Sequence, residues 1–159
     1  MTAADPSERV QQALDLLLPG ARLQRFDQST ATAAEAAAAI GCPAGAIVKS
    51  LLFLIDGRSL LILAAGDRQV SDAKLAARFG VGRKRVRMGD PATVLHLTGY
   101  EVGGVPPIGH TSPLSVLMDA SLDRFETLYA AAGTGSTVFA VTPRELQRIT
   151  QADVADVTR

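Results

Sequence analysis

Lys49 is the first residue whose type and position could do chemistry, because it is the one charge in the ten-residue apolar run 46–55. An ammonium group in a buried strand must reach solvent at a cleft or meet an anionic or hydrogen-bonding partner, since burying it unpaired is costly. Strand periodicity places Lys49 on the face of Leu51 and Phe53. A lysine that meets a ligand and a lysine that only extends to solvent from a strand end both fit this position.

The segment 103–110, Gly-Gly-Val-Pro-Pro-Ile-Gly-His, is the second candidate. Glycine allows close approach of backbone to a ligand, so such a loop could present N–H groups to a phosphate or to a developing oxyanion. Pro106 and Pro107 have no N–H, which leaves other residues as donors. An ordinary Gly/Pro surface loop is the alternative. The candidate donors are Gly103, Gly104, Val105, Ile108 and Gly109.

Other reactive residues are sparse. His96 and His110 are the only histidines and lie far apart with no acidic cluster nearby, so we expect no metal site and no cofactor. Cys42, the only cysteine, precedes a proline and is expected to be a small buried hydrophobe. A single cysteine also excludes an intramolecular disulfide and favours a cytoplasmic protein.

The net charge is zero, from 16 Lys and Arg against 16 Asp and Glu, so a nucleic-acid partner would need a local basic patch. Four charges within five residues provide one, whereas residues 90–159 hold four basic and eight acidic groups. We expect this cluster to contact phosphates; a solvated surface is the alternative. With 4% aromatic residues and no Trp, a base-stacking platform is poorly supported. The basic cluster comprises Arg83, Lys84, Arg85 and Arg87.

The elements that must position these residues follow from caps and periodicity. A chain of 159 residues with 47% apolar and 20% charged residues fits one compact domain, 1–159. An N-cap followed by a first-turn proline or an N3 acid predicts helix starts near Asp5, Thr32, Ser71, Asp90 and Thr142. The expected helices are 6–19, 32–41, 72–79, 91–97, 121–132 and a last one from 143.

Apolar runs bounded by turn residues predict the strands. Asp56-Gly57 separates the two longest runs and signals a hairpin. Strands intermixed with helices favour an α+β fold. The N-terminal residues 1–9 lack the pattern of a secretory signal, and the charges inside 46–66 argue against a membrane span. The expected strands are 22–26, 46–55, 59–65, 84–87, 114–118 and 137–141.

Five motifs in register resemble the YbaK-like aminoacyl-tRNA deacylases, which are relatives of the editing domain of bacterial prolyl-tRNA synthetase. The resemblance runs from about residue 29 to residue 149. It implies a single α+β domain with a curved, mostly antiparallel mixed sheet and surrounding helices. The motifs are Ile-Val-Lys-Ser-Leu at 47–51, Ala-Gly-Asp at 65–67, the segment 98–110, Met-Asp at 118–119, and Ala-Gly at 132–133 with Phe-Ala-Val-Thr-Pro at 139–143.

The resemblance also implies an activity, namely hydrolysis of the ester of a misacylated tRNA such as Cys- or Ala-tRNA(Pro) without a metal. Lys49 matches a family lysine near the terminal adenosine, and Gly104 with Pro107 matches a Gly-x-x-Pro loop whose backbone binds the carbonyl oxygen. The nucleophile is water, a substrate hydroxyl or a substrate thiol. The implied partners are misacylated tRNA and, as a second option, an aminoacyl-tRNA synthetase.

A wider set of substrate contacts follows from the same resemblance. Asp119 matches a family aspartate that either contacts substrate or caps a helix. Val105 and Pro106 fill the middle of the loop and would shape the amino-acid pocket. A non-catalytic module that binds an aminoacyl-nucleotide or a tRNA end is the competing function. The expected substrate contacts are Phe26, Thr30, Ser50, Thr98, Gly99, Gly103, Val105, Pro106, Pro107, His110, Asp119 and Gly133.

Overall fold

The fold is a single mixed sheet flanked by five helices, which confirms the expected α+β class. The computed structural model describes residues 5–159; residues 1–4, with which the excluded secretory signal would begin, lie outside the described part. The strands are β1 (Gln24–Arg25), β2 (Ile47–Ile55), β3 (Arg58–Ala65), β4 (Val86–Met88), β5 (Ser115–Asp119), β6 (Leu128–Ala131), β7 (Thr137–Val141) and β8 (Asp153–Ala155).

The helices begin where the caps predict. In α5, Thr142 Oγ1 accepts from the Glu145 N–H while the Glu145 carboxylate accepts from the Thr142 N–H, a complete capping box. Asp5 and Asp90 cap helices whose first residue is proline. No helix within residues 5–159 is long and apolar enough to cross a membrane. The helices are α1 (Pro6–Leu17), α2 (Ala33–Ile40), α3 (Asp72–Phe79), α4 (Pro91–Thr98) and α5 (Pro143–Thr150).

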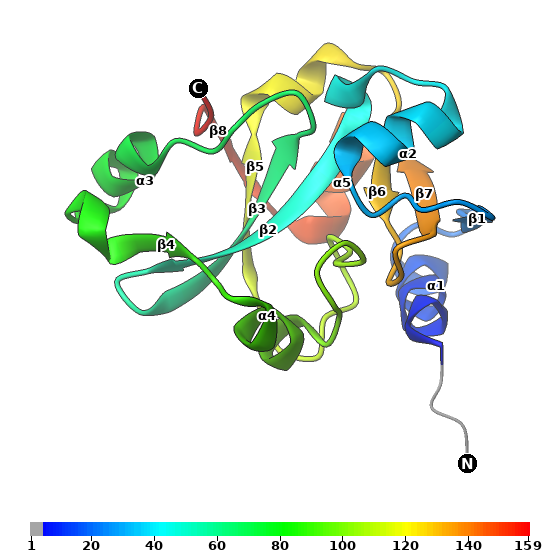
Figure 1. Ribbon diagram of the computed structural model, residues 1–159, viewed down its shortest axis with the longest axis horizontal. Helices are drawn as coiled ribbons and strands as arrows, with labels where there is room; N and C mark the ends of the chain where they lie inside the picture. The colour runs from blue at the N-terminus through cyan, green and yellow to red at the C-terminus, as the bar shows by residue number, and fades with distance from the viewer. Residues whose placement is uncertain (1–4) are drawn as a thin grey trace.

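The strand order is β1-β7-β6-β2-β3-β5-β8, and β4 pairs with β2 beside this path. The pairs β2–β6, β3–β5 and β5–β8 are parallel and the other four are antiparallel. Figure 1 shows β2 and β3 as a long diagonal hairpin, with α3 and β4 toward one end and β6, β7 and α1 toward the other. The hairpin is therefore the element to which both ends of the sheet attach.

The two faces of the hairpin face different cores because side chains alternate along a strand. Val48 and Leu52 face the larger core, which α1, α4 and α5 help to form. Phe53 and Ile55 face a smaller core with Leu75 of α3. This alternation confirms that Lys49 shares a face with Leu51 and Phe53, and it puts Ser50 on the opposite face, toward the larger core.

The expected helix over 121–132 is wrong. A short 3-10 helix, η3 (Ala120–Arg124), is followed by β6, where burial alternates along the strand. Leu128 and Ala130 fill the main core between β7 and β2, and this tertiary pairing outweighs the helix propensity of an alanine-rich segment.

Two shorter strands differ from expectation as well. The expected strand 84–87 is a 3-10 turn, η2 (Arg83–Arg85), followed by β4, and the strand expected over 22–26 narrows to β1. The sequence also does not predict β8, which pairs with β5 near the C-terminus. Each of these is a strand of two or three residues, too short to show a period.

Candidate active site

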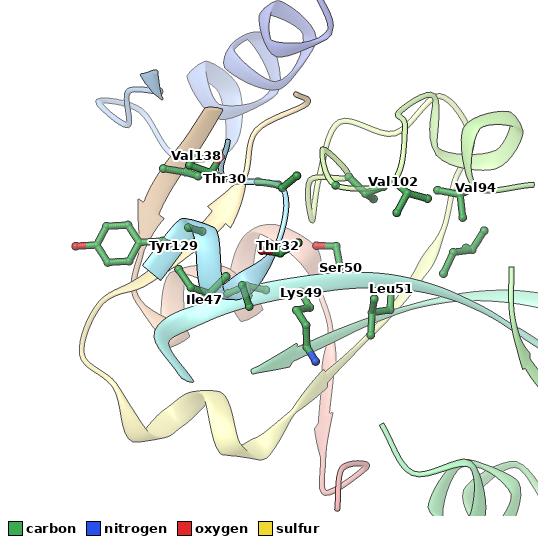
Figure 2. A pocket seen from close by; sticks show the side chains of 18 of the residues that line it. Thr30, Thr32, Ile47, Lys49, Ser50, Leu51, Val94, Val102, Tyr129 and Val138 are labelled. Carbon is green, nitrogen blue, oxygen red and sulfur yellow. The ribbon is translucent and has the colours of Figure 1, made fainter. Parts of the chain in front are cut away.

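A cavity of about 300 Å³ lies beside β2 and is the best candidate for a functional site. Its walls come from the start of α2, the middle of β2, the end of β4, the segment 103–110, which we call the glycine-rich loop, and strands β6 and β7. Figure 2 shows Thr30, Ser50 and Val102 on this side of β2. The lining residues are 30–33, Ala36, 47–52, Met88, Gly89, Val94, Val102, Gly103, Val105, Tyr129, Ala131 and Val138.

The cavity lining is apolar with few polar groups. Among the residues that line it there is no aspartate, glutamate, arginine or histidine. The hydroxyls of Thr30, Thr32 and Ser50 and the exposed main chain supply its polarity. No three His, Cys, Asp or Glu side chains within residues 5–159 gather where they could hold a metal ion. Chemistry in this cavity would thus rely on backbone donors and on groups that the ligand brings.

The loop at 103–105 has two unpaired main-chain donors in residues that line the cavity. No group within the described residues accepts a hydrogen bond from the N–H of Gly103 or Val105, and both residues line the cavity. Gly103 has φ of +94°, a conformation that glycine adopts readily. Two unpaired N–H groups in an apolar cavity can bind an anionic or carbonyl oxygen.

Gly104 has a different role from the one expected of a donor. Its N–H donates to the Glu101 carbonyl (3.0 Å), and its own carbonyl accepts from the Gly133 N–H (2.9 Å). A Cβ at Gly104 would lie 2.9 Å from Cα of Thr134, so the two segments touch through their backbones. Gly104 is therefore a packing residue, and its two neighbours in the loop are the available donors.

The side chains of Tyr100 and His110 bind carbonyl groups of the glycine-rich loop and stabilise its conformation. Tyr100 Oη donates to the Gly109 carbonyl (2.6 Å), and His110 Nε2 lies 2.7 Å from the Pro106 carbonyl. Burial lowers the pKa of His110, although its bond to Pro106 opposes the shift. The imidazole is thus neutral near pH 7 and donates from Nε2. Pro106, Pro107 and His110 do not line the cavity, and Ile108 and Gly109 face another hollow on the far side of the loop.

Lys49 borders the cavity through its main chain, but its side chain points to the other side of β2 (Figure 2). Its Nζ donates to the carbonyl of Arg68 at 2.6 Å. Burial lowers the Lys49 pKa, and the nearby Asp67 carboxylate partly opposes this. Asp67 is held in turn by Arg124, with N–O distances of 2.7 and 3.0 Å. The role expected for Lys49 at the tRNA end stays a prediction.

Asp119 is fully buried and bonded within the fold, as the structural alternative expects. It caps η3 by accepting from Ser121 N, and it accepts from the Val157 N–H (2.8 Å) and Thr158 Oγ1 (3.0 Å) near the C-terminus. Burial is the largest single effect on the Asp119 pKa and raises it. The hydrogen bonds from Ser121, Val157 and Thr158 together outweigh burial, so the Asp119 pKa is lowered. Asp119 does not line the cavity.

The C-terminus of α4 holds two more expected contacts away from the cavity. Thr98 is buried, donating to the Val94 carbonyl (2.7 Å) and accepting from the Tyr100 N–H (3.1 Å). Gly99 has φ of +86° and ends the helix, and a Cβ there would lie 2.5 Å from Thr111. Both residues set the path by which the chain leaves α4 for the loop.

The turn between β6 and β7 joins the walls of the cavity. Thr30 donates from its N–H to the Gly135 carbonyl (2.7 Å), and Phe26 donates to the Ser136 carbonyl (2.9 Å). Gly133 has φ of +101° and binds the glycine-rich loop. Of these residues only Thr30 lines the cavity, whereas Phe26 and Gly133 support the segments around it.

The basic cluster is exposed on η2 and β4, one strand residue from the cavity. Arg85 pairs with Asp56 at 3.6 Å with both side chains mostly in solvent. Arg83, Lys84 and Arg87 form no ion pair within the described residues, and Met88, which follows Arg87, lines the cavity. A chain of phosphates leaving the cavity past Met88 would meet these charges.

Sequence reasoning missed the apolar lining of the cavity. Met88 and Val102 are 57% and 65% exposed at its edge, and Tyr129 and Val138 come from strands on the far wall. The available signal was Val102, a large apolar residue directly before two glycines. The sequence does not indicate that residues 128–131 form a wall, because it predicts a helix there.

Comparison with known proteins places this geometry among editing domains. A family model described as "Aminoacyl-tRNA editing domain" matches residues 27–149. The uncharacterized protein YwhH of Bacillus subtilis (strain 168) is 38% identical over 130 residues, which are 81% of each chain. A solved structure of a candidate trans-editing enzyme for prolyl tRNA synthetase superposes with a TM-score of 0.90 and 36% identity, covering 99% of both chains.

Larger proteins also contain a related segment. The proline–tRNA ligase of Desulfovibrio desulfuricans is 40% identical over 88 residues, which are 55% of this chain but 15% of the ligase. The chain thus spans only a small part of these relatives. It matches the candidate trans-editing enzyme, in contrast, over nearly its whole length.

Proposed function

Because this chain belongs to the aminoacyl-tRNA editing domain family, we propose that it hydrolyses, in trans, the ester that joins a wrong amino acid to tRNA. The observation that carries the proposal is an apolar cavity whose lining includes Gly103 and Val105, two residues with unpaired N–H groups. The 99% mutual coverage with the candidate trans-editing enzyme supports action in trans.

Ester hydrolysis passes through a tetrahedral intermediate that carries a negative oxygen. The nucleophile adds to the carbonyl carbon, the carbonyl oxygen becomes the oxyanion, and collapse expels the ribose oxygen, which takes up a proton. Donors at Gly103 and Val105 would stabilise the oxyanion more than the neutral carbonyl, and removing one such donor typically slows a reaction by about 100- to 1,000-fold.

No side chain that lines the cavity is a strong base, which restricts where the nucleophile comes from. Water gives the free amino acid directly, whereas the thiol of a cysteinyl substrate would first expel the tRNA and form a thiolactone that water then opens. The free hydroxyl of the terminal ribose would by itself only move the acyl group to the neighbouring oxygen, so in this proposal it orients the attacking water. In each case the cavity contributes orientation, because holding the nucleophile near the carbonyl replaces a bimolecular encounter. The ester need not meet a histidine or a metal in this proposal.

The lining favours a small amino acid. Ala31, Ala36 and Ala131 leave room beside aliphatic walls, while the volume of about 300 Å³ must also admit the end of the ribose. Alanine and cysteine fit these limits, and the aliphatic walls offer a bulky or charged side chain neither space nor a partner. We therefore propose Ala- or Cys-tRNA(Pro) as substrates.

The tRNA itself would be held outside the cavity. In this proposal the basic cluster binds backbone phosphates beyond Met88, and Lys49 binds near the terminal adenosine only if its ammonium leaves the Arg68 carbonyl. A synthetase partner would be needed only to deliver the substrate. Such contacts are electrostatic and fall off with salt.

Deacylation of purified charged tRNAs tests the proposal. Wild-type protein should speed release of alanine or cysteine from tRNA(Pro) and spare Pro-tRNA(Pro), with Ser- and Thr-charged tRNAs completing the panel. Ester lifetimes equal to those in buffer across the whole panel would contradict it. If tRNA or an aminoacyl-nucleotide still bound in that case, the chain would be a binding module.

A further inference from the structure

The outer edge of β2 is open over its middle residues. On that side β6 pairs with β2 only at Ile47 and Val48, and β4 pairs only from Phe53 onward. No other described strand covers the gap between them. The cavity lies against this gap, with residues 49–52 in its lining.

The alternation of hydrogen bonds along β2 shows which of its main-chain groups face the gap. In an antiparallel pair, alternate residues direct both their N–H and their C=O to the same neighbouring strand. The Gly66 N–H donates to the Ile47 carbonyl, so odd-numbered residues of β2 bond to β3. The Gly89 N–H donates to the Leu52 carbonyl, so even-numbered residues face the other way. The N–H and C=O of Ser50 therefore both open into the gap.

The side chain of Ser50 is unpaired as well. Its Oγ is the one buried side-chain oxygen or nitrogen in residues 5–159 that has no hydrogen-bond partner. Figure 2 shows Ser50 on the side of β2 toward Thr32 and Val102, whereas Lys49 and Leu51 point away. A buried hydroxyl without a partner leaves its desolvation cost uncompensated, so it calls for a partner that arrives with a ligand.

One residue of open β-edge is complementary to one amino acid. It offers an acceptor and a donor at the spacing at which another residue would offer a donor and an acceptor. An aminoacyl group carries this pair, because its amino group donates and its ester carbonyl accepts. The cavity lining has no carboxylate to bind an ammonium group, so neutral oxygens must do so.

We propose that the aminoacyl group adds to the open edge of β2 opposite Ser50, its α-ammonium donating to the Ser50 carbonyl and Oγ and its ester carbonyl accepting from the Ser50 N–H in addition to the loop donors at Gly103 and Val105. This assignment rests on the function proposed above and adds the part of the substrate that is recognised. The site then requires a free α-amino group, and it rejects an acyl group without one whatever the side chain.

A pair of esters that differ only at the α-amino group tests this. Alanyl-tRNA and propionyl-tRNA have the same carbon chain, and only the first carries the amino group. Relative to the spontaneous rate of each ester, the enhancement by wild-type protein should be at least about 100-fold greater for alanyl-tRNA, as expected when charged hydrogen bonds are lost from a dry site. Equal enhancement of the two esters would overturn the proposal.

Ser50→Ala isolates the hydroxyl, with Ser115→Ala at an exposed position of β5 as the control. Because Oγ is unpaired in the free protein, Ser50→Ala should melt at the same or a higher temperature, yet deacylate alanyl-tRNA about tenfold more slowly with little change on propionyl-tRNA. A lower melting temperature with equal losses on both esters would show a structural role instead and contradict the assignment.

A binding measurement separates this inference from the catalytic proposal. The amide analogues 3′-alanylamido- and 3′-propionylamido-3′-deoxyadenosine cannot be hydrolysed as esters, so their affinities do not depend on turnover. Tighter binding of the alanyl analogue, lost in Ser50→Ala, supports the Ser50 site even if no tRNA is deacylated. Equal affinities would overturn the Ser50 site even if deacylation is observed.

Discussion

Asp119 on β5 and Ser50 on β2 are polar side chains of the same sheet with opposite surroundings. The Asp119 carboxylate accepts from Ser121, Val157 and Thr158, whereas the Ser50 hydroxyl has no partner. The first region satisfies its polar groups internally and holds the C-terminal segment in place. The second leaves them open beside a cavity. We infer from this contrast that the first buried polar site stabilises the fold and that the second is a ligand site.

The largest effect should come from Asp119→Asn, which keeps the shape but turns one acceptor into a donor. At least one of the donors from Ser121, Val157 and Thr158 then faces an N–H, so the free energy of unfolding should fall by about 3 kcal/mol. Urea unfolding measures this. The protein that remains folded should deacylate at the wild-type rate, and a loss of rate without a loss of stability would break the comparison.

The same carboxylate predicts an acid dependence. Its pKa is lowered in the fold, so the stability that it contributes is present above its unfolded pKa, about 3.9, and is lost as the pH falls through the folded pKa. Asp119→Asn should remove this part of the acid sensitivity. Parallel stability curves for the two proteins below pH 4 would argue against it.

On the open side, Gly104→Ala should act on activity. The new Cβ would lie 2.9–3.0 Å from the backbone of Gly133 and Thr134, so the loop must shift and its donors with it. Deacylation should fall by about 100-fold, as expected for a displacement near 1 Å. Gly82→Ala is the matched control, because nothing lies within 4 Å of its Cβ position and it should keep full activity.

Lys49→Met sharpens the comparison because the main chain of Lys49 borders the cavity while its side chain lies on the opposite face of β2. The change keeps the apolar stem but leaves the Arg68 carbonyl without its 2.6 Å donor, so stability should fall by about 1 kcal/mol. Because the effect of this change would pass through the turn at residues 65–68, it should slow the hydrolysis of alanyl-adenosine and of alanyl-tRNA equally. A loss confined to alanyl-tRNA, measured as a higher KM, would instead place the ammonium on a tRNA phosphate.

The smallest effect should come from the basic cluster. Replacing Arg83, Lys84 and Arg87 with Ser removes three exposed charges near the cavity edge and should leave the melting temperature unchanged. The slope of log affinity for tRNA against log salt should become shallower by about two to three units. An unchanged slope would identify the cluster as solvated surface with no phosphate contact.

The sequence predicts much of the fold through local signals. The capping box at Thr142, the cap and proline at Asp90 and the turn at Asp56-Gly57 involve neighbouring residues, and each element begins or turns where expected. The segment 128–131 could not be predicted in the same way, because its strand state depends on pairing with β7 and β2. Local propensity does not record such distant partners.

The site was only partly predictable for a similar reason. Thr30, Ser50, Gly103 and Val105 were expected contacts and line the cavity, but the open edge of β2 is a gap between two distant strands that no single segment encodes. The direction of the Lys49 side chain follows from strand parity. That the cavity opens on the opposite face does not, because it depends on where the loop at 103–105 packs.

Filling the cavity tests its role most directly. Ala31 is exposed in the lining, 3.0 Å from where a Cβ on Gly103 would lie, so Ala31→Trp should occupy the space without disturbing the core. Ala38→Trp, exposed on α2 outside the cavity, is the control. We expect single-turnover deacylation of alanyl-tRNA(Pro) to fall by at least tenfold in Ala31→Trp, at an unchanged melting temperature, and to stay at the wild-type rate in Ala38→Trp. Full activity in Ala31→Trp would place the reaction outside this cavity.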